Sequence, residues 1–327
     1  MDSLYDIVTF GEGLIRFSPP RYERLEQSNV FDAHVIGPGL EVAVNASRIG
    51  LKSAWISAVG DTPIGAKIVN KVREHGAEVS SVIRVPDGRT GLCFQEPGSA
   101  PRPDRFFYDA NHTALRSLSP ENLSWAALRQ CRLCQLSLTG LDVNPETMRL
   151  VESACATAVD ARSLISISLD SIPDLPIPEA LFPQVEGLIA QAQIFVVTLR
   201  AATTVLHCTG SSEEIAAAFQ SRYGINTVVV IDNHLPTPRT GVWRSVARTD
   251  RLHEDRSYAL EVIDAGGALS AFTAAFLYGF LKETVDAGLR YGNAAAALAH
   301  TIPGHLNWCT LLDLQAQIQG TGTKLQR

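Results

Sequence analysis

Residues 258–281 read YALEVIDAGGALSAFTAAFLYGFL, and this stretch decides the fold class. Residues 258–263 have the composition of a short strand, Gly266 and Gly267 predict a turn, and the apolar run after them predicts a long helix. A glycine-rich turn that opens a helix can hold an anion, because free backbone N–H groups and the helix dipole point at it. At its helical end, however, this turn carries Leu269 and Ser270 rather than an acid or a base.

The same alternation of strand and helix recurs along the chain. Strands are expected at 6–10, 30–36, 53–59, 133–138, 164–169, 194–198 and 227–231. Helices are expected at 42–49, 64–75, 145–154 and 212–221. This order predicts an α/β fold with a mostly parallel sheet covered on both faces, and a ligand site at the carboxyl ends of its strands.

Two segments break that rhythm. Residues 82–108 contain the short extended pieces GLCFQE and RFFY around a loop rich in proline, glycine and arginine, which predicts a small antiparallel flap. Residues 248–256 are rich in charge and are expected to form a solvated loop.

Composition limits the function classes. The 327 residues are 46% hydrophobic and carry a net charge of −6, which favours a large folded core and argues against a nucleic-acid partner. The N-terminus MDSLYDIVTF lacks the pattern of a secretion signal, so we expect a cytoplasmic protein. The uncharged stretch 265–281 is at the short limit for a membrane span and is better explained as a buried helix, so no membrane partner is expected.

The cysteines do not predict a metal site. Cys131 and Cys134 form a C-x-x-C within CRLCQLSLTG, but this segment has the pattern of a strand. No second pair stands at zinc-ligand spacing, so we expect packing cysteines and no protein-bound metal.

Six segments together resemble the ribokinase-like, or PfkB-type, carbohydrate kinases, and within that family most of all the 2-keto-3-deoxygluconate kinases. They are FGEGLIRFSPPRYERLEQSNVFDAHV (10–35), AVGDTPIGAKIVNKVREHGAEVSSV (58–82), TGLCFQE (90–96), FFYDANHTALRSLSPENL (106–123), AFTAAFLYGFL (271–281) and YGNAAAALAH (291–300). The resemblance implies a three-layer α/β/α sandwich with a small β lid. Residues 1–12, 40–85 and 112–327 would form the large domain, and residues 13–39 with 86–111 the lid.

The resemblance also implies an activity. Members of the family transfer the γ-phosphoryl group of ATP to a hydroxyl of a sugar or sugar acid, with the help of Mg²⁺ and often K⁺. Many of them form homodimers through the lid.

The family's D-T-x-G-A-G-D motif is altered in this chain. Its first aspartate is Asp264, its anion hole falls on Gly266, Gly267 and Ala268, and its final aspartate, the general base, becomes Ser270. A general base typically contributes about 10²–10⁴-fold to the rate, so its loss predicts an inactive or strongly impaired catalyst. The glycines themselves fit either an anion cradle or a tightly packed turn.

The sugar-binding motifs have changed as well. The family's G-G-A-E-x-N falls on residues 36–41, where Gly37 and Gly39 remain candidates and Glu41 replaces the asparagine. The Y-Y-R that meets a sugar carboxylate falls on residues 107–109, where only Tyr108 matches. Asp109 reverses the charge there, so Arg105 or Arg102 would have to supply the cation.

The motifs that serve ATP and Mg²⁺ differ in the same way. The D-x-N-Y-R strand end falls on residues 168–172, and the metal-linked N-x-x-E falls on residues 198–201. The nucleotide turn falls on residues 231–236, where its glycines are lost. Asn293 still matches the helix beside the nucleotide.

Three hypotheses follow. In the first, the chain is an impaired kinase homologue that binds a ligand or regulates a partner. In the second, it is an active kinase whose base is relocated to Asp264, Asp232, Asp170 or Glu41. In the third, it is a different enzyme on the same scaffold, with His234 or His253 as a catalytic group.

Overall fold

The computed structural model describes residues 3–321, and a large sheet forms its centre. The ten strands run in the order β13-β12-β11-β10-β9-β8-β1-β4-β5, with β14 paired to β12. All pairs from β11 to β5 are parallel, as the sequence predicts, and β12, β13 and β14 add an antiparallel edge. The strands are β1 (Tyr5–Phe10), β4 (Ser53–Gly60), β5 (Val82–Val85), β8 (Cys131–Leu138), β9 (Leu164–Leu169), β10 (Ile194–Thr198), β11 (Thr227–Thr237), β12 (Thr240–Arg248), β13 (Leu252–Glu254) and β14 (Tyr258–Glu261).

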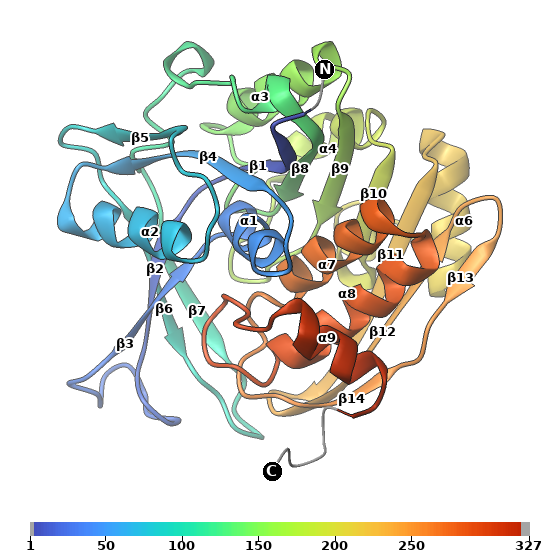
Figure 1. The fold of residues 1–327 in the computed structure, drawn as a ribbon. Coiled ribbons are helices and arrows are strands. Elements are labelled where there is room, and N and C mark those ends of the chain that lie inside the picture. Colours follow the sequence, from blue (N-terminus) through green and yellow to red (C-terminus); the bar gives the residue numbers. More distant parts are fainter. Residues whose placement is uncertain (1–2, 322–327) are drawn as a thin grey trace.

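Helices cover both faces of this sheet (Figure 1). Neighbouring strand residues point to opposite faces. Val8 belongs to the core cluster that includes residues of α3, α4 and α6, and Ile7 to the cluster that includes residues of α1, α7 and α8. The predicted α/β architecture is therefore confirmed. The helices are α1 (Pro38–Arg48), α2 (Pro63–Glu74), α3 (Met148–Asp160), α4 (Phe182–Ile189), α5 (Leu199–Thr204), α6 (Ser212–Tyr223), α7 (Ala268–Lys282), α8 (Val285–Ala299) and α9 (Leu311–Ile318), with 3-10 turns at Pro120–Asn122, Leu128–Gln130 and Glu179–Leu181.

Helix α7 is apolar because it is packed inside the protein. It lies against α8 along its length and also contacts α1, and Phe272 and Phe276 on it are fully buried. Within residues 3–321, no helix combines the length and apolar character that a membrane crossing requires.

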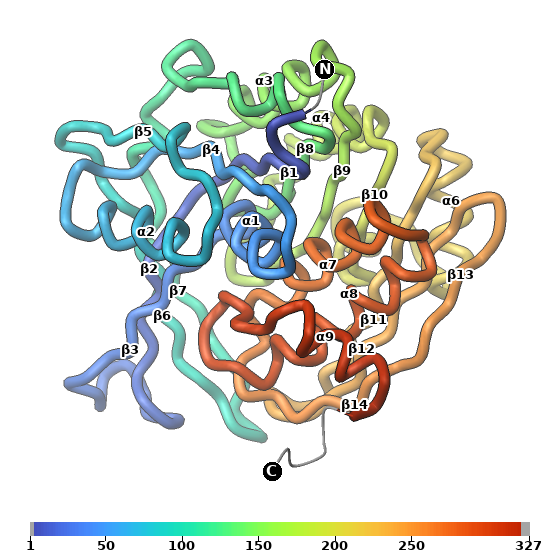
Figure 2. The backbone as a smooth tube through the Cα atoms, viewed as in Figure 1, coloured from blue at the N-terminus to red at the C-terminus, as the bar shows by residue number. Residues whose placement is uncertain are grey.

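A second, four-stranded sheet forms the lid, in the order β3-β2-β6-β7. Its strands are β2 (Leu14–Ser18), β3 (Asp32–Ile36), β6 (Gly91–Glu96) and β7 (Arg105–Asp109). Figure 2 shows these two chain segments leaving the main body together. Strands β6 and β7 pair antiparallel, as predicted for the pieces GLCFQE and RFFY, and β2 joins β6 in parallel, so the whole lid sheet is mixed. Residues 82–85 belong instead to the edge of the large sheet as β5. That the lid is a separate domain stays a prediction.

Two further expectations were wrong. Residues 252–254 form strand β13, because they pair with the extended β12 rather than remaining a loop. Strand β11 continues past residue 231 to Thr237, because backbone pairing with β12 carries it through the polar run. The resulting hairpin reaches the lid, where Arg239 donates hydrogen bonds to the carbonyl of Gly98 and to Asp104.

The cysteines are free thiols, including Cys131 and Cys134 on β8. Burial raises the pKa of both thiols, which keeps them protonated and disfavours metal or redox chemistry. Their surroundings agree with the predicted packing role.

Candidate active site

A cavity of about 490 Å³ lies between the lid and the large sheet. Its floor comes from the carboxyl ends of β8, β9 and β10, with Ser137, Ser168 and Thr198, which is where the sheet topology predicts a ligand site. Its roof comes from the lid, with Phe106 and Tyr108 on β7. The glycine turn before α7 supplies one wall.

The glycine turn is both packed and open to the cavity. A Cβ atom on Gly266 would lie 2.2 Å from Nε2 of His305, and one on Gly267 would lie 2.0 Å from the carbonyl oxygen of His305. Gly266, Gly267, Ala268 and Leu269 nevertheless line the cavity, and the first N–H groups of α7 have no partner within the helix. The N–H of Gly266 already donates to Asp264, so the anion-binding part is reduced to the residues after it.

Ser270, at which the motif resemblance expects a general base, lines the cavity beside Glu41. Its hydroxyl donates to Oε2 of Glu41 at 2.8 Å. The other oxygen of Glu41 lies 2.8 Å from Nδ1 of His305 and accepts the N–H of Gly37 at 2.9 Å. A carboxylate therefore stands next to the serine, supplied by α1 rather than by α7.

The environment of Glu41 makes it a weak base. Its side chain is 4% exposed, and burial alone would raise its pKa. The charge of His305 and the hydrogen bonds from His305, Gly37 and Ser270 outweigh burial and lower the pKa. A carboxylate held in its charged form by this many donors takes up a proton less readily.

Asp264 has a structural partner on the lid. Nη1 and Nη2 of Arg16, on lid strand β2, lie 3.2 and 2.5 Å from its two oxygens, and both side chains are buried. The N–H of Gly304 also donates to Asp264, at 3.0 Å. Burial would raise the pKa of Asp264, but the charge of Arg16 lowers it well below its usual range. Asp264 thus ties the lid to the glycine turn and is a poor candidate for a base.

The lid brings Tyr108 into the cavity and leaves the other expected lid residues outside. Strand alternation exposes Arg105 and Asp109 on the opposite face of β7, where Asp109 pairs with Arg89. Arg102 pairs with Glu96 instead of facing a ligand. The expectation that Arg105 or Arg102 meets a ligand therefore has no support in this geometry.

Gly37 and Gly39 open helix α1, and both are needed for close packing. A Cβ atom on Gly37 would lie 2.1 Å from the carbonyl oxygen of Glu12, and one on Gly39 would lie 2.6 Å from that of Phe10. Gly37 also lines the cavity and positions Glu41 through its N–H.

The part of the cavity at which the resemblance expects a nucleotide differs from the expected motif. Leu235 and Trp243, from the β11–β12 hairpin, line it. Asn293 is fully buried, and its amide contacts Trp243, Ser245 and Asp255 at 2.7–3.1 Å. Asn293 therefore supports the hairpin from behind and would have to move before it could meet a nucleotide.

The residues at the expected metal position do not fit Mg²⁺. Asp170 lines the cavity but accepts hydrogen bonds from Thr198 and from the N–H of Ser171, and burial raises its pKa. The family's glutamate is Ala201, which offers no oxygen ligand, and Arg200 brings a positive charge to the same wall. Within residues 3–321 there is no group of three or more His, Cys, Asp or Glu side chains that could hold a metal ion.

The other predicted candidates lie elsewhere. Asp232 is on β11 opposite Arg244 of β12, and His234 is exposed on the same strand. His253 is buried between Thr249 and Asp286, at 2.8 Å from each, as a structural contact. None of the three lines the cavity.

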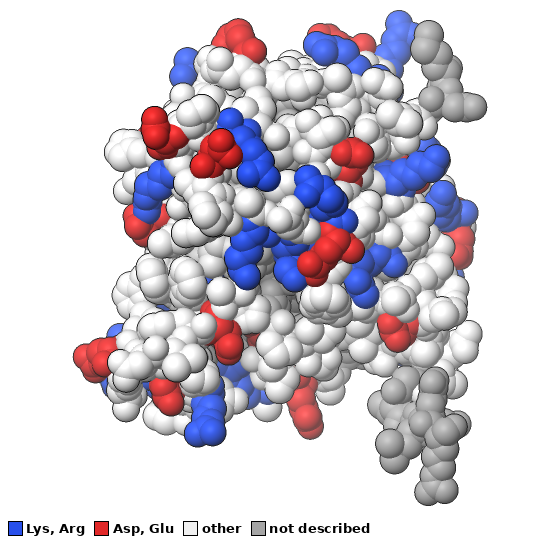
Figure 3. Space-filling model, turned by 60° about the vertical axis from the view of Figure 1, so that its left-hand side comes forward, with Lys and Arg blue, Asp and Glu red and all other residues white. Residues whose placement is uncertain are grey.

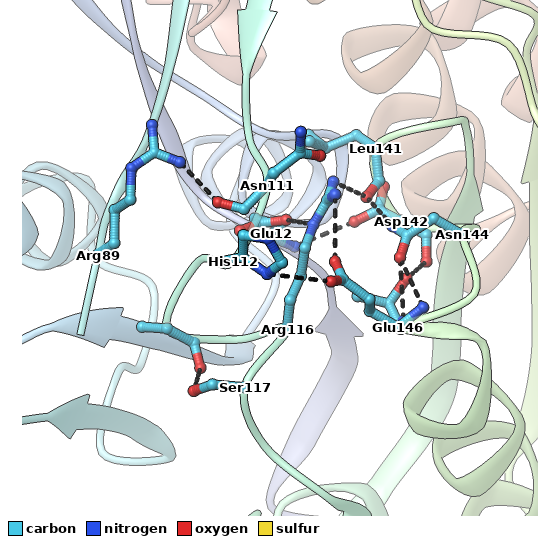
Figure 4. Close-up of polar contacts among 12 residues, drawn as sticks. Glu12, Arg89, Asn111, His112, Arg116, Ser117, Leu141, Asp142, Asn144 and Glu146 are labelled. Carbon is cyan, nitrogen blue, oxygen red and sulfur yellow. Dashed lines mark hydrogen bonds and ion pairs between the residues drawn. The ribbon is translucent and has the colours of Figure 1, made fainter.

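A second polar cluster lies beside Leu141, a residue that lines the cavity (Figure 4). Arg116 lies between Glu12 and Glu146, at 3.1 and 3.6 Å, and donates to the carbonyl of Leu141, a floor residue. Asp142 accepts the N–H of Glu12 at 3.0 Å. Burial raises the pKa of Asp142 to about 8, so near neutral pH this carboxyl is largely protonated.

The sequence did not reveal His305. It lies in TIPGHLNW (301–308), a loop after α8 with no helix or strand pattern, and its partner Glu41 is 264 positions away. A lone histidine in a polar loop carries no signal by itself, so only the fold shows its role.

Charged side chains of both signs share the surface. Figure 3 shows lysine and arginine side chains around a hollow near the middle of one face, with acidic side chains among them.

Comparisons with known proteins agree with the fold. The pattern of the pfkB family carbohydrate kinases matches residues 5–308. The chain is 28% identical over 324 residues to a 2-dehydro-3-deoxygalactonokinase of Haloferax volcanii, covering 98% of this chain and 99% of the relative. It is 25% identical over 300 residues to a 5-dehydro-2-deoxygluconokinase of Listeria monocytogenes, covering 90% and 89%.

Solved structures show the same fold. The 2-dehydro-3-deoxygluconokinase of Thermotoga maritima superposes with a TM-score of 0.90 at 23% identity, covering 97% of this chain and all of that one. A putative ribokinase II of E. coli in complex with ATP and Mg²⁺ superposes with a TM-score of 0.82 at 19% identity, covering 97% and 100%. On its sequence over nearly its whole length, this chain belongs to the pfkB family of carbohydrate kinases.

Proposed function

We propose that this pfkB-family protein binds a sugar-like ligand in its cavity and transfers phosphate very slowly or not at all, so that it acts as a ligand-binding or regulatory protein. The observation that carries the proposal is the contact of Ser270 with Glu41. The base position holds an alcohol, and the carboxylate beside it is already bound by His305 and Gly37. Losing a positioned base costs about 10²–10⁴-fold in rate.

The remaining machinery supports the same conclusion. Thr198 donates a hydrogen bond to Asp170 in the part of the cavity where Mg²⁺ would be needed, and Arg200 also lines the cavity. Phosphoryl transfer depends on a metal that neutralises the developing charge on the phosphate oxygens. Binding of ATP is therefore expected to be weak, whereas the cavity itself remains large enough for a monosaccharide.

A binding titration tests the proposal. Calorimetry with a panel of sugars, with and without ATP and Mg²⁺, is expected to give saturable heat for a sugar-like ligand without any ADP being formed. Absence of binding by every sugar would contradict the ligand-binding role, and rapid ADP formation would contradict the impaired one.

An active kinase that uses Glu41 as its base is the second candidate function, because the carboxylate of Glu41 accepts a hydrogen bond from Ser270. In that case Glu41→Gln would lower turnover by about 10²–10⁴-fold. If the native chain is already impaired, the same substitution leaves turnover unchanged.

We further propose that the protein is a cytoplasmic homodimer that associates through the lid. The family resemblance suggests the dimer, and Phe107 on β7 is 51% exposed on the face away from the cavity. Free thiols at all cysteine positions suit a reducing compartment. Light scattering of the native chain and of Phe107→Asp tests the dimer, which the charged side chain would weaken.

A further inference from the structure

The cavity carries more acids than bases. Its lining includes five carboxylates, whereas Arg200 and His305 are the lining residues that can carry a positive charge: the acids are Glu41, Asp104, Asp170, Asp174 and Asp264. Three of the acids lie toward the lid. Asp104 stands between lid strands β6 and β7, and Asp264 is bound by Arg16 of β2. Glu41 accepts the N–H of Gly37, the residue that follows lid strand β3. The lid side is therefore the acidic side.

The cations on that side are already occupied. Arg16 is paired with Asp264, and His305 with Glu41. Arg239, behind the wall, is paired with Asp104 at 3.0 Å. A ligand carboxylate placed under the lid would meet fixed negative charge without an unpaired cation among the residues described there, and such an arrangement rejects anions.

Two of the lining carboxylates, in contrast, have acceptor oxygens to which no described residue donates. The N–H of Gly98 and the guanidinium of Arg239 both bind Oδ1 of Asp104, and no described residue donates to Oδ2. Asp174 is exposed at the rim, and no described residue forms a hydrogen bond or ion pair with its carboxylate. Burial raises the pKa of Asp104 in spite of its contact with Arg239, and an ammonium at the open Oδ2 would favour the charged form of this carboxyl.

A buried amide points to a polar ligand in the same place. Gln95, on β6, is 4% exposed and lines the cavity. Its Oε1 accepts from Ser18 at 3.2 Å, while no described residue accepts a hydrogen bond from its Nε2. Phe106 and Tyr108 add an apolar surface, with stacked rings 6.4 Å apart, of the kind that receives the C–H face of a sugar.

We propose that the cavity binds a polyhydroxy ligand that carries an amino group and no acid group, with the amine at Asp104 and Asp174 and a hydroxyl at Gln95. This inference rests on the proposed ligand-binding function and names its ligand class. It departs from the sugar acids that the family resemblance implied, because the arginine that would meet an acid is Asp109 here and faces outward.

A matched ligand series tests the inference. The probes are 1-amino-1-deoxyglucitol, glucitol and gluconate, with their galacto counterparts, so that one terminal group changes from ammonium to hydroxyl to carboxylate on each skeleton. Calorimetry at pH 7 is expected to show the amine binding about tenfold more tightly than the neutral polyol, and the acid weakest of the three. Asp174→Asn should bring the ratio of amine to polyol affinity close to one, whereas Asp109→Asn, on the outer lid face, should leave that ratio unchanged.

The possible results distinguish the preference for an amine from the ligand-binding function on which it rests. If an acid binds more tightly than its amine, the inference is overturned and the ligand-binding function stands. The inference is also overturned if Asp174→Asn leaves the ratio unchanged. If all six compounds fail to bind at millimolar concentration, the inference and the proposed function both fail.

Discussion

Ser270 and Glu41 are in direct hydrogen-bond contact, at 2.8 Å, although 229 positions separate them in the sequence. The motif resemblance expects another residue at each of these two positions, and the structure brings the two side chains together. The carboxylate that the pattern puts on α7 is absent, and one is present on α1 instead.

This contact predicts that restoring an aspartate will harm the protein. Ser270→Asp would place two carboxylates within contact of each other in a buried site, where like charges cannot both ionise cheaply. We expect a lower melting temperature than that of the native chain, with a larger loss at pH 8 than at pH 5, measured by calorimetry.

Two further variants control this experiment. Ser270→Ala removes only one hydrogen bond, which is worth about 1 kcal/mol, and should show no such pH dependence. Combining Glu41→Asn with Ser270→Asp should recover most of the lost stability. Equal melting temperatures for Ser270→Asp and the native chain would refute the like-charge argument.

The pair formed by Arg16 and Asp264 predicts a large loss of stability when one partner is removed. Arg16→Met leaves a buried carboxylate without its cation, at a cost of about 3–5 kcal/mol. Urea denaturation should show that cost, and Asp264→Asn combined with Arg16→Met should cost less than the two single changes added together. Strict additivity would mean that the pair does not interact.

Because the pKa of Asp142 is raised, this carboxyl should make the folding stability fall as the pH rises, whereas a carboxylate of lowered pKa makes it rise. The pKa of Asp142 is about 8 in the folded chain, above its value in the unfolded chain, so the folded state binds the extra proton. The protonated Asp142 therefore stabilises the folded state fully below about pH 4, and this stabilisation is lost as the pH rises toward 8. Asp142→Asn, which mimics the protonated form, should flatten the fall in stability between pH 5 and pH 8, as measured by urea denaturation at each pH. A curve parallel to that of the native chain would contradict the assignment.

Arg239 predicts a link between the β11–β12 hairpin and the lid. It binds the carbonyl of Gly98 and the carboxylate of Asp104, and it also stacks on Tyr22 at 4.9 Å. Arg239→Ala should increase hydrogen exchange at residues 98–104. Arg244→Ala on the same hairpin, whose partners are Glu213 and Glu254, serves as the control and should not change exchange in the lid.

The sequence predicted those parts of the fold that depend on local pattern. Alternating strands and helices identified the central sheet, and the glycine turn before α7 located one wall of the cavity. Strand β11 was predicted too short because Asn233, His234 and Pro236 have the composition of a turn, while pairing with β12 keeps them extended.

The candidate site was less predictable, because its contacts join distant positions. Motif alignment singled out Ser270, Glu41 and Tyr108, which line the cavity, but it gave no reason to connect Glu41 with His305. Arg105 was placed wrongly because the side-chain direction on β7 depends on register, which a loop-rich segment does not reveal.

A steady-state assay of phosphoryl transfer tests most directly whether the protein binds a ligand without turning it over. The native chain would be incubated with ATP, Mg²⁺ and a panel of amino, neutral and acidic sugars, and ADP formation would be followed alongside ligand binding. We expect ligand binding with turnover below about 0.1 s⁻¹, since loss of a positioned base removes about 10²–10⁴-fold from an ordinary rate. Turnover above about 1 s⁻¹ with any of these sugars would contradict it.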